Sequence, residues 1–229
     1  MEESTNLTIG ARKTGMVLAA IVLGVLVCSA NANASTILTS TLGPGDVYEW
    51  GQDVFVVGHW IFDGSQVVAM PFTLEAGATV SDATLALINI MGGDTPASID
   101  IESDDGSTQP GSILTTLTQV GQTPYDGGLV SFTCDASCTL AAGSYWLVAS
   151  QPDSSNPQGW FWTQQQDSAG ITASNQSGSA TGPWAVTGTG AVAAFRIDGE
   201  YSVPEPSSLL LLGSGLLGVA ALKRRRAKS

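Results

Sequence analysis

Short runs of β-branched and aromatic residues recur between residues 54 and 201, each bounded by Gly, Pro, Asp, Ser or Asn. This pattern predicts β-strands. Where Ile99 and Ile101 alternate with polar residues, the period of two indicates an antiparallel strand with one buried face. No long stretch between the termini combines helical periodicity with capping signals. We expect nine strands: Val54–Phe62, Val67–Leu74, Ala83–Ile90, Ala97–Glu102, Ile113–Val120, Leu129–Thr133, Ser144–Ser150, Trp160–Thr163 and Ala191–Tyr201.

Many short strands with Gly- and Pro-rich turns and no helices favour an all-β fold. Residues 35–202, called the body below, are long enough for one domain with its own core. We therefore expect the body to form a single antiparallel β-sandwich, jelly-roll-like in topology. Residues 152–183 are rich in Ser, Gly, Gln and Asn. They predict a long, partly ordered excursion from the sandwich.

The first 34 residues have the organisation of a secretory signal peptide. A charged start and an apolar stretch occupy residues 12–27, and the small residues Ala32 and Ala34 precede Ser35. This order predicts cleavage by signal peptidase before Ser35 and export of the remainder of the chain.

Residues 203–229 consist of three parts, each with a different physical character. A Pro-flanked acidic tetrad comes first, then an apolar run over residues 207–222, then a basic cluster. Sixteen helical residues span about 24 Å, slightly less than a bilayer core, and basic side chains at the end can compensate. The run predicts a transmembrane helix with the basic tail, residues 223–229, in the cytoplasm. The tetrad is Val203, Pro204, Glu205 and Pro206, and the basic anchor is Lys223, Arg224, Arg225 and Arg226.

This order of parts resembles the PEP-CTERM sorting signal of Gram-negative bacteria that make exopolysaccharide. The resemblance implies an exosortase substrate that is exported through the inner membrane and anchored there by its C-terminal helix. Processing by the exosortase then delivers the protein to the cell surface or the extracellular space. The resemblance covers about the last eighth of the chain, so it predicts destination rather than activity.

Part of the body resembles the choice-of-anchor β-sandwich domains, which precede interchangeable cell-surface anchors. The segments that carry the resemblance are residues 67–74, 83–90, 99–101, 111–114 and 140–148. They are packing motifs, and the last of them, Leu-Ala-Ala-Gly-Ser-Tyr-Trp-Leu-Val, places Trp146 in the expected core. No catalytic residue follows from this resemblance.

Removal of both ends leaves a strongly acidic body. It holds 17 acidic side chains and one basic side chain, Arg196, which leaves a net charge of −16. Such a surface repels nucleic acid and anionic lipid, so neither is expected as a partner.

Cysteine use fits an oxidising compartment. Cys134 and Cys138 are the two cysteines of the body, and we expect them to form a structural disulfide. The alternatives, a metal site or a redox pair, lack further ligands and the two-residue spacing. The third cysteine, Cys28, raises the alternative of lipid attachment, but Val27 stands where a small residue is required.

Two groups of residues are candidates for ligand binding. The densest acidic stretch offers oxygen ligands for calcium at Asp100, Glu102, Asp104 and Asp105, although it departs from the EF-hand pattern and equally fits a turn. In the second group, alternation puts Trp160 and Trp162 on one face of a strand, where they could stack on sugar rings. The alternative is that these indoles cover the core.

Catalytic signatures are weak. The chain has one histidine, His59, without a supporting nucleophile motif, and its many carboxylates show no spacing diagnostic of a glycosidase. We therefore expect no enzyme and, apart from the calcium alternative, no cofactor. The expected function is that of a non-catalytic surface or matrix protein associated with exopolysaccharide. A carbohydrate-binding module that uses Trp160 and Trp162 is the first alternative, and an unrecognised secreted hydrolase is the second.

Overall fold

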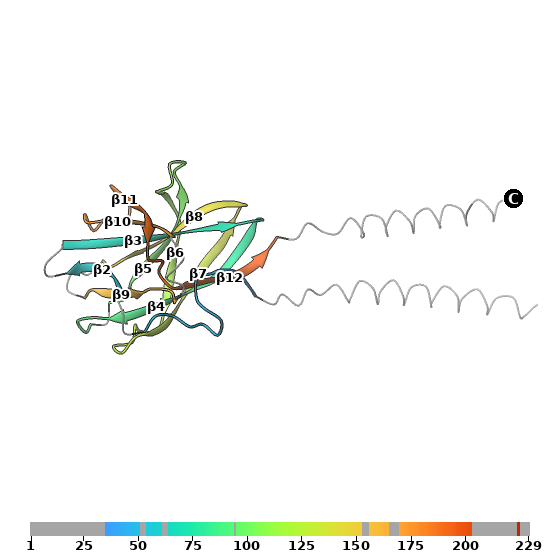
Figure 1. Cartoon of the computed structure of the whole chain (residues 1–229). Coiled ribbons are helices and arrows are strands. Elements are labelled where there is room, and N and C mark those ends of the chain that lie inside the picture. The colour runs from blue at the N-terminus through green and yellow to red at the C-terminus, as the bar shows by residue number, and fades with distance from the viewer. Residues whose placement is uncertain are drawn as a thin grey trace, which may run out of the picture. The chain divides into compact units, whose positions relative to one another are not determined.

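The computed structural model describes residues 35–50, 54–60, 64–93, 95–152, 156–164 and 170–202, together with Arg224. Within the described part of the body there are 12 strands and no helix, which confirms the predicted all-β class (Figure 1). The strands are β1 (Thr36–Ser40), β2 (Val54–Trp60), β3 (Gly64–Leu74), β4 (Ala78–Asn89), β5 (Ser98–Asp104), β6 (Pro110–Val120), β7 (Gly128–Leu140), β8 (Gly143–Ser150), β9 (Gln158–Phe161), β10 (Gly170–Asn175), β11 (Ala185–Gly190) and β12 (Phe195–Tyr201).

Eight of these strands close into a barrel, so the predicted sandwich is wrong. The hydrogen-bonded order β4-β7-β6-β5-β8-β3 is completed by β2 and β9, because β2 pairs with β3 and β9 pairs with both β2 and β4. The closing strand β9 contributes only four residues. Trp160 in it lies opposite Phe55 on one side and Leu87 on the other. The pairing of this short strand with both β2 and β4 turns one continuous open sheet into a closed barrel.

The barrel is closed over only part of its length. Along β4, residues 87–89 pair with β9, whereas residues 78–85 pair with β12. Along β3, residues 64–66 pair with β2, and residues 67–69 pair with β10. The sheet therefore branches at both strands and continues outward, through β12 to β1 and through β10 to β11.

The main core fills the space enclosed by these strands. Ile99 and Ile101 are fully buried in it, as the alternation of β5 predicts. Its largest fully buried side chains include Trp160, Phe132 and Phe195. The edge-to-face contact of Trp160 with Phe195, with ring centroids 6.2 Å apart, links the closing strand to β12.

Three strands were not expected from the sequence: β1, β10 and β11. The segment 152–183, predicted as a partly ordered excursion, contains β9 and β10. Strand β10 reads Gly-Ile-Thr-Ala-Ser-Asn and β11 reads Ala-Val-Thr-Gly-Thr-Gly, so small and polar residues outnumber strand-favouring ones. Backbone pairing with β3, rather than local propensity, holds β10 in place.

The predicted signal peptide and the predicted helix at 207–222 lie outside the described residues. In the part of the chain that the structure describes, no helix has the length and hydrophobicity needed to cross a membrane.

Candidate functional site

The polar face of β5 is buried, although it was expected to face solvent. Asp100 is 4% exposed and Glu102 is fully buried. Cross-strand pairing places Asp100 opposite Val148 and Glu102 opposite Trp146, so these four side chains share one face of the sheet.

A second apolar cluster explains this burial. We call it the outer cluster, and it lies on the face of the sheet that carries Trp146 rather than in the main core. The segment between β10 and β11 packs against it through Ala180 and Trp184. The prediction that Trp146 is buried is confirmed, since 1% of it is exposed, but it stands in this cluster. The buried members are Val67, Ala69, Trp146, Val148 and Ala173.

Hydrogen bonds satisfy two of the three acids on this face. Thr116 donates to Oδ1 of Asp100 at 2.5 Å. Nε1 of Trp146 donates to Oδ2 of Asp104 at 3.0 Å. Both carboxylate oxygens of Glu102 are buried without a hydrogen-bond partner. An ionised carboxylate in that position would be strongly destabilising.

Burial raises the pKa values of both Asp100 and Glu102. Desolvation, and secondly the charge of Asp100, raise the pKa of Glu102 from 4.5 to about 7. Burial also raises the pKa of Asp100, opposed by the hydrogen bond from Thr116. The one basic side chain of the body, Arg196, is bonded to Asp46 and Asp198 instead. Glu102 is therefore expected to be protonated through much of the acidic and neutral range.

The four acids predicted as calcium ligands lie in different environments. Asp105 is in the exposed turn after β5, where it accepts hydrogen bonds from Gln109 and Ser107 that lower its pKa to about 2. Asp104 accepts a bond from the backbone of Gly106 in the same turn. Among the described residues, no group of three or more His, Cys, Asp or Glu side chains is placed to hold a metal ion.

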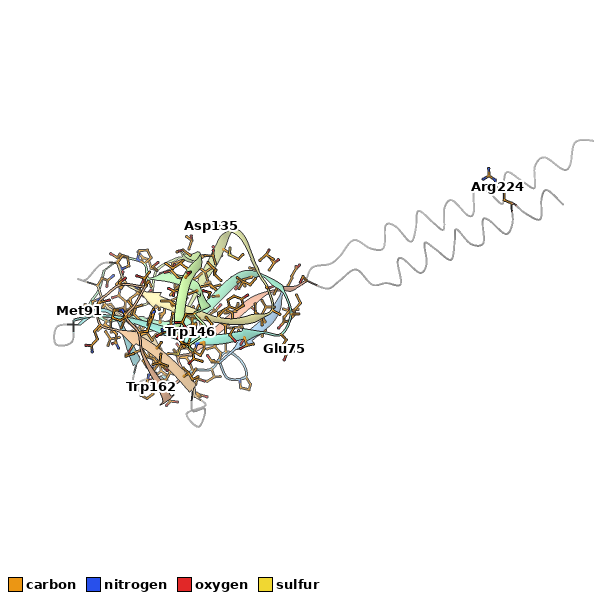
Figure 2. All side chains as sticks on the ribbon, turned by 90° about the horizontal axis from the view of Figure 1, so that it is seen from above. Glu75, Met91, Asp135, Trp146, Trp162 and Arg224 are labelled. Carbon is orange, nitrogen blue, oxygen red and sulfur yellow. A yellow bond between two sulfur atoms is a disulfide. The ribbon has the colours of Figure 1, made fainter. Side chains whose placement is uncertain are left out.

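The predicted sugar-binding face of Trp160 and Trp162 does not form. Trp160 is fully buried in the main core, and its Nε1 donates to the carbonyl oxygen of Ala194 at 2.9 Å. Trp162, labelled in Figure 2, is partly buried beyond the end of β9. Its ring makes a tilted contact with the ring of Phe55. The alternation of a single strand could not reveal this outcome, because all four residues of β9 are buried.

A different aromatic group reaches the surface. Trp50 is 59% exposed, yet its ring stacks on buried Phe161, with centroids 5.8 Å apart and planes 18° apart. Tyr48 contacts both rings, at 6.3 Å from Trp50 and 5.2 Å from Phe161. The sequence contained one signal for this group, the Tyr-Glu-Trp spacing of residues 48–50. It gave no sign of Phe161 as the backing ring.

The turn before β7 borders this aromatic group. Its backbone is fixed by bonds to the carbonyl oxygen of Pro124 from Asn89, at 3.0 Å, and from Gly127, at 3.3 Å. Gly127 has φ +79°, and a Cβ there would lie 2.8 Å from Phe161 and 3.1 Å from Trp50. Glycine is therefore required for the turn to approach the rings. The turn carries Tyr125, which is 67% exposed, and Asp126, whose charge adds to burial in raising the pKa of Tyr48.

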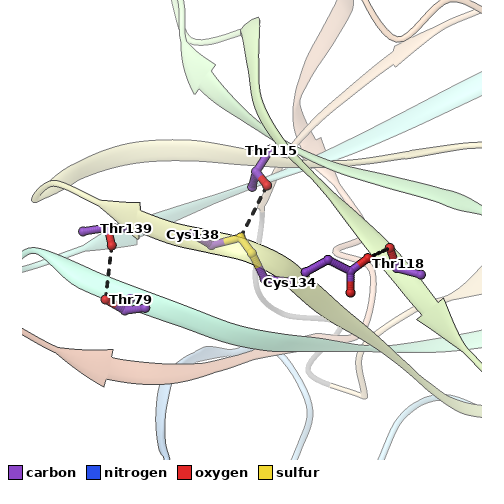
Figure 3. Close-up of a disulfide and its surroundings, with 7 residues drawn as sticks. Thr79, Thr115, Thr118, Cys134, Cys138 and Thr139 are labelled. Atoms are coloured by element: carbon purple, nitrogen blue, oxygen red, sulfur yellow. Dashed lines mark hydrogen bonds between the residues drawn. A yellow bond between two sulfur atoms is a disulfide. The ribbon is translucent and has the colours of Figure 1, made fainter.

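The predicted disulfide between Cys134 and Cys138 is confirmed (Figure 3), with Cα atoms 6.2 Å apart. It spans an irregularity in the pairing of β7 with β4, where five steps along β7 oppose two along β4. The flanking hydrogen bonds, Thr118 to Asp135 and Thr79 with Thr139, hold this loop against β6 and β4. The pair is structural rather than part of a wider sulfur site.

His59 lies in β2 opposite Ser65, and its side chain is outside the described residues. Of the predicted signal-cleavage residues Ala32, Ala34 and Ser35, the structure describes Ser35. The predicted tetrad at 203–206 lies outside the described residues.

Comparison with protein-family models matches the C-terminal part of the chain. Residues 202–226 match the PEP-CTERM protein-sorting motif. This motif supports an exosortase substrate, and it implies export and membrane-anchored processing in Gram-negative bacteria. No curated protein matches the chain. The resemblance of the body to choice-of-anchor domains is therefore not confirmed.

Proposed function

We propose that this chain is a non-catalytic exported protein that an exosortase delivers to the cell surface or extracellular matrix, where it associates with exopolysaccharide. The observation that carries the proposal is the sorting motif at residues 202–226. It coincides with the tetrad, apolar run and basic cluster that carry the resemblance to the PEP-CTERM sorting signal.

The position of the motif relative to the body supports processing at this point. The last strand, β12, ends at Tyr201 and pairs with both β1 and β4. Ser202 still bonds to the carbonyl oxygen of Gly77 through its backbone and its hydroxyl, each at 2.7 Å. Cleavage after this residue would leave every strand of the body in place.

The environments of four of the 17 acids of the body are unsuited to glycoside hydrolysis. Glycosidases need two carboxyl groups that reach a substrate. Asp100 and Glu102 are shielded from solvent by the outer cluster, and Asp46 and Asp198 are bonded to Arg196. The non-catalytic assignment is tested by assaying the purified protein for glycoside and ester hydrolysis.

Cell fractionation tests the proposed sorting. The full-length chain would be expressed in an exosortase-containing Gram-negative host and in the same host without the exosortase. We expect the protein at the surface or in the medium of the first host and in the inner membrane of the second. Replacement of Pro204, Glu205 and Pro206 by alanine should reproduce the second distribution, while Glu75→Ala, at an exposed glutamate of the body, should not. The same distribution in both hosts would overturn the proposal.

A further inference from the structure

The two most exposed large aromatic residues among those described are close in the fold, because Trp50 lies beside Gly127 and Tyr125 belongs to the same turn as that glycine. Tyr125 and Trp50 have the largest exposed fractions among the aromatic side chains, at 67% and 59%. Leaving a tryptophan in solvent forfeits a large hydrophobic gain, so its exposure suggests a role outside folding.

Contacts with two neighbouring rings fix the position of the Trp50 side chain. Phe161, which is 3% exposed, stacks against its ring, and Tyr48 contacts both. Phe161 in turn packs with Leu42, Ala86 and Ala194. The close approach of Gly127 fixes the position of the turn relative to the indole. A ring positioned in advance loses little conformational freedom when it binds a partner.

Hydrogen-bonding groups lie near the rigid ring, because Tyr48 contacts it and the turn that contains Gly127 also carries Tyr125 and Asp126. Tyr48 and Tyr125 carry hydroxyls that donate and accept, and Asp126 carries an acceptor carboxylate whose charge acts on Tyr48. An aromatic face bordered by hydroxyl and carboxylate groups matches a sugar, because a pyranose ring has an apolar C–H face and a rim of hydroxyls.

The net negative charge of the body favours uncharged polysaccharides over anionic ones. It holds 17 acidic side chains and one basic one. That base, Arg196, is bonded to Asp46 and Asp198. An anionic polymer would be repelled and would find no cation to bind. An uncharged polymer meets no such barrier.

We propose that Tyr48, Trp50, Tyr125 and Asp126 form a binding platform for an uncharged polysaccharide, with a sugar ring stacked on Trp50 and its hydroxyls bonded to Asp126 and the tyrosines. The platform rests on the proposed function, which brings the body into contact with extracellular polymers, and it identifies the surface that makes the contact.

Affinity electrophoresis of the full-length protein in mild detergent tests the platform. The gels would contain laminarin, dextran or hydroxyethyl cellulose as uncharged polymers, and alginate as an anionic one. We expect at least one uncharged polymer to retard the protein, and we expect any retardation by alginate, which the basic cluster of the full-length chain can bind, to be the same in Trp50→Ala. Trp50→Ala should weaken the binding to the uncharged polymer at least tenfold, equivalent to about 1.4 kcal/mol. Trp50→Phe should retain most of it. Ile37→Ala is the matched control, because Ile37 is also 59% exposed but lies in β1.

Equal thermal midpoints for wild type and variants would show that the fold is intact. The platform is overturned if no uncharged polymer retards the wild-type protein, if Trp50→Ala weakens retardation by alginate as much as retardation by the uncharged polymer, or if Trp50→Ala and Ile37→Ala behave alike. It is also overturned if Trp50→Ala changes the oligomeric state, measured by light scattering, without changing polysaccharide binding. Each result is obtained with purified protein, so failure of the platform is distinguishable from failure of sorting in cells.

Discussion

Nε1 of Trp146 donates a hydrogen bond to Oδ2 of Asp104 at 3.0 Å, which joins β8 to the end of β5 on the outer face of the sheet. The bond lets a buried indole satisfy its N–H while its rings fill the outer cluster. It also keeps the carboxylate of Asp104 at the margin of a face whose other two acids, Asp100 and Glu102, are buried.

Replacement of Asp104 by alanine should lower the free energy of unfolding by about 2 kcal/mol. The indole N–H of Trp146 would lose its charged acceptor while its rings remain buried. Asp104→Asn retains an acceptor oxygen and should recover at least half of the loss. Urea unfolding followed by tryptophan fluorescence measures both changes. Equal stabilities for wild type and Asp104→Ala would show that this bond contributes nothing.

Glu102 should make the fold less stable as pH rises. Its pKa is raised from 4.5 to about 7, so folding favours the protonated acid. The contribution of protonated Glu102 to the free energy of unfolding is fully present below pH 4.5 and is lost as pH rises through about 7. The total loss is about 3 kcal/mol. The other acids on its face are Asp100 and Asp104. Its neighbours across the strands are Trp146 and Ile113, and neither titrates.

Urea unfolding between pH 5 and pH 9 tests this dependence. Glu102→Gln removes the titrating group and should flatten the decline between pH 5 and pH 7, while Glu75→Gln, at an exposed position, should leave it unchanged. An identical decline in wild type and Glu102→Gln would contradict the assignment to Glu102.

Loss of the disulfide should have a moderate effect. Because Cys134 and Cys138 enclose a short loop, the chain-entropy model gives about 2 kcal/mol of stabilisation. We expect Cys134→Ala/Cys138→Ala to lose about this amount in urea unfolding, and wild type with reductant to lose a similar amount. Alanine is preferred to serine because Cys138 is 3% exposed, and a hydroxyl would be buried there. A double variant as stable as the oxidised protein would contradict the prediction.

Where apolar and polar residues alternate strongly along a strand, the sequence alone was sufficient to predict the strand and its core-facing residues. The period of two in β5 correctly placed Ile99 and Ile101 in the core. It could not show that Asp100 and Glu102 would be buried, because they share a face with the outer cluster. Ala180 and Trp184 pack against that cluster from a Ser- and Gly-rich segment far along the chain. Cover of this kind depends on tertiary contacts that leave no periodic signal.

Neither the closure of the barrel nor the exposed aromatic group could be predicted from the sequence, because both also depend on tertiary contacts. The sequence predicts a strand at Trp160, but only its two partners, β2 and β4, make that strand the closing one. Pairing on both sides buries Trp160, which is the alternative that the sequence left open beside a sugar-binding face. Trp50 is exposed next to Phe161, from which it is separated by more than a hundred residues, so neither spacing nor composition could have indicated that contact.

The intact mass of the mature protein tests sorting by an exosortase most directly. In exosortase-containing cells we expect a species that begins at Ser35 and lacks the apolar run and basic cluster of residues 207–229. Cells without the exosortase should yield a species that extends to Ser229. A protein that retains Ser229 in equal yield in both cells would contradict exosortase processing.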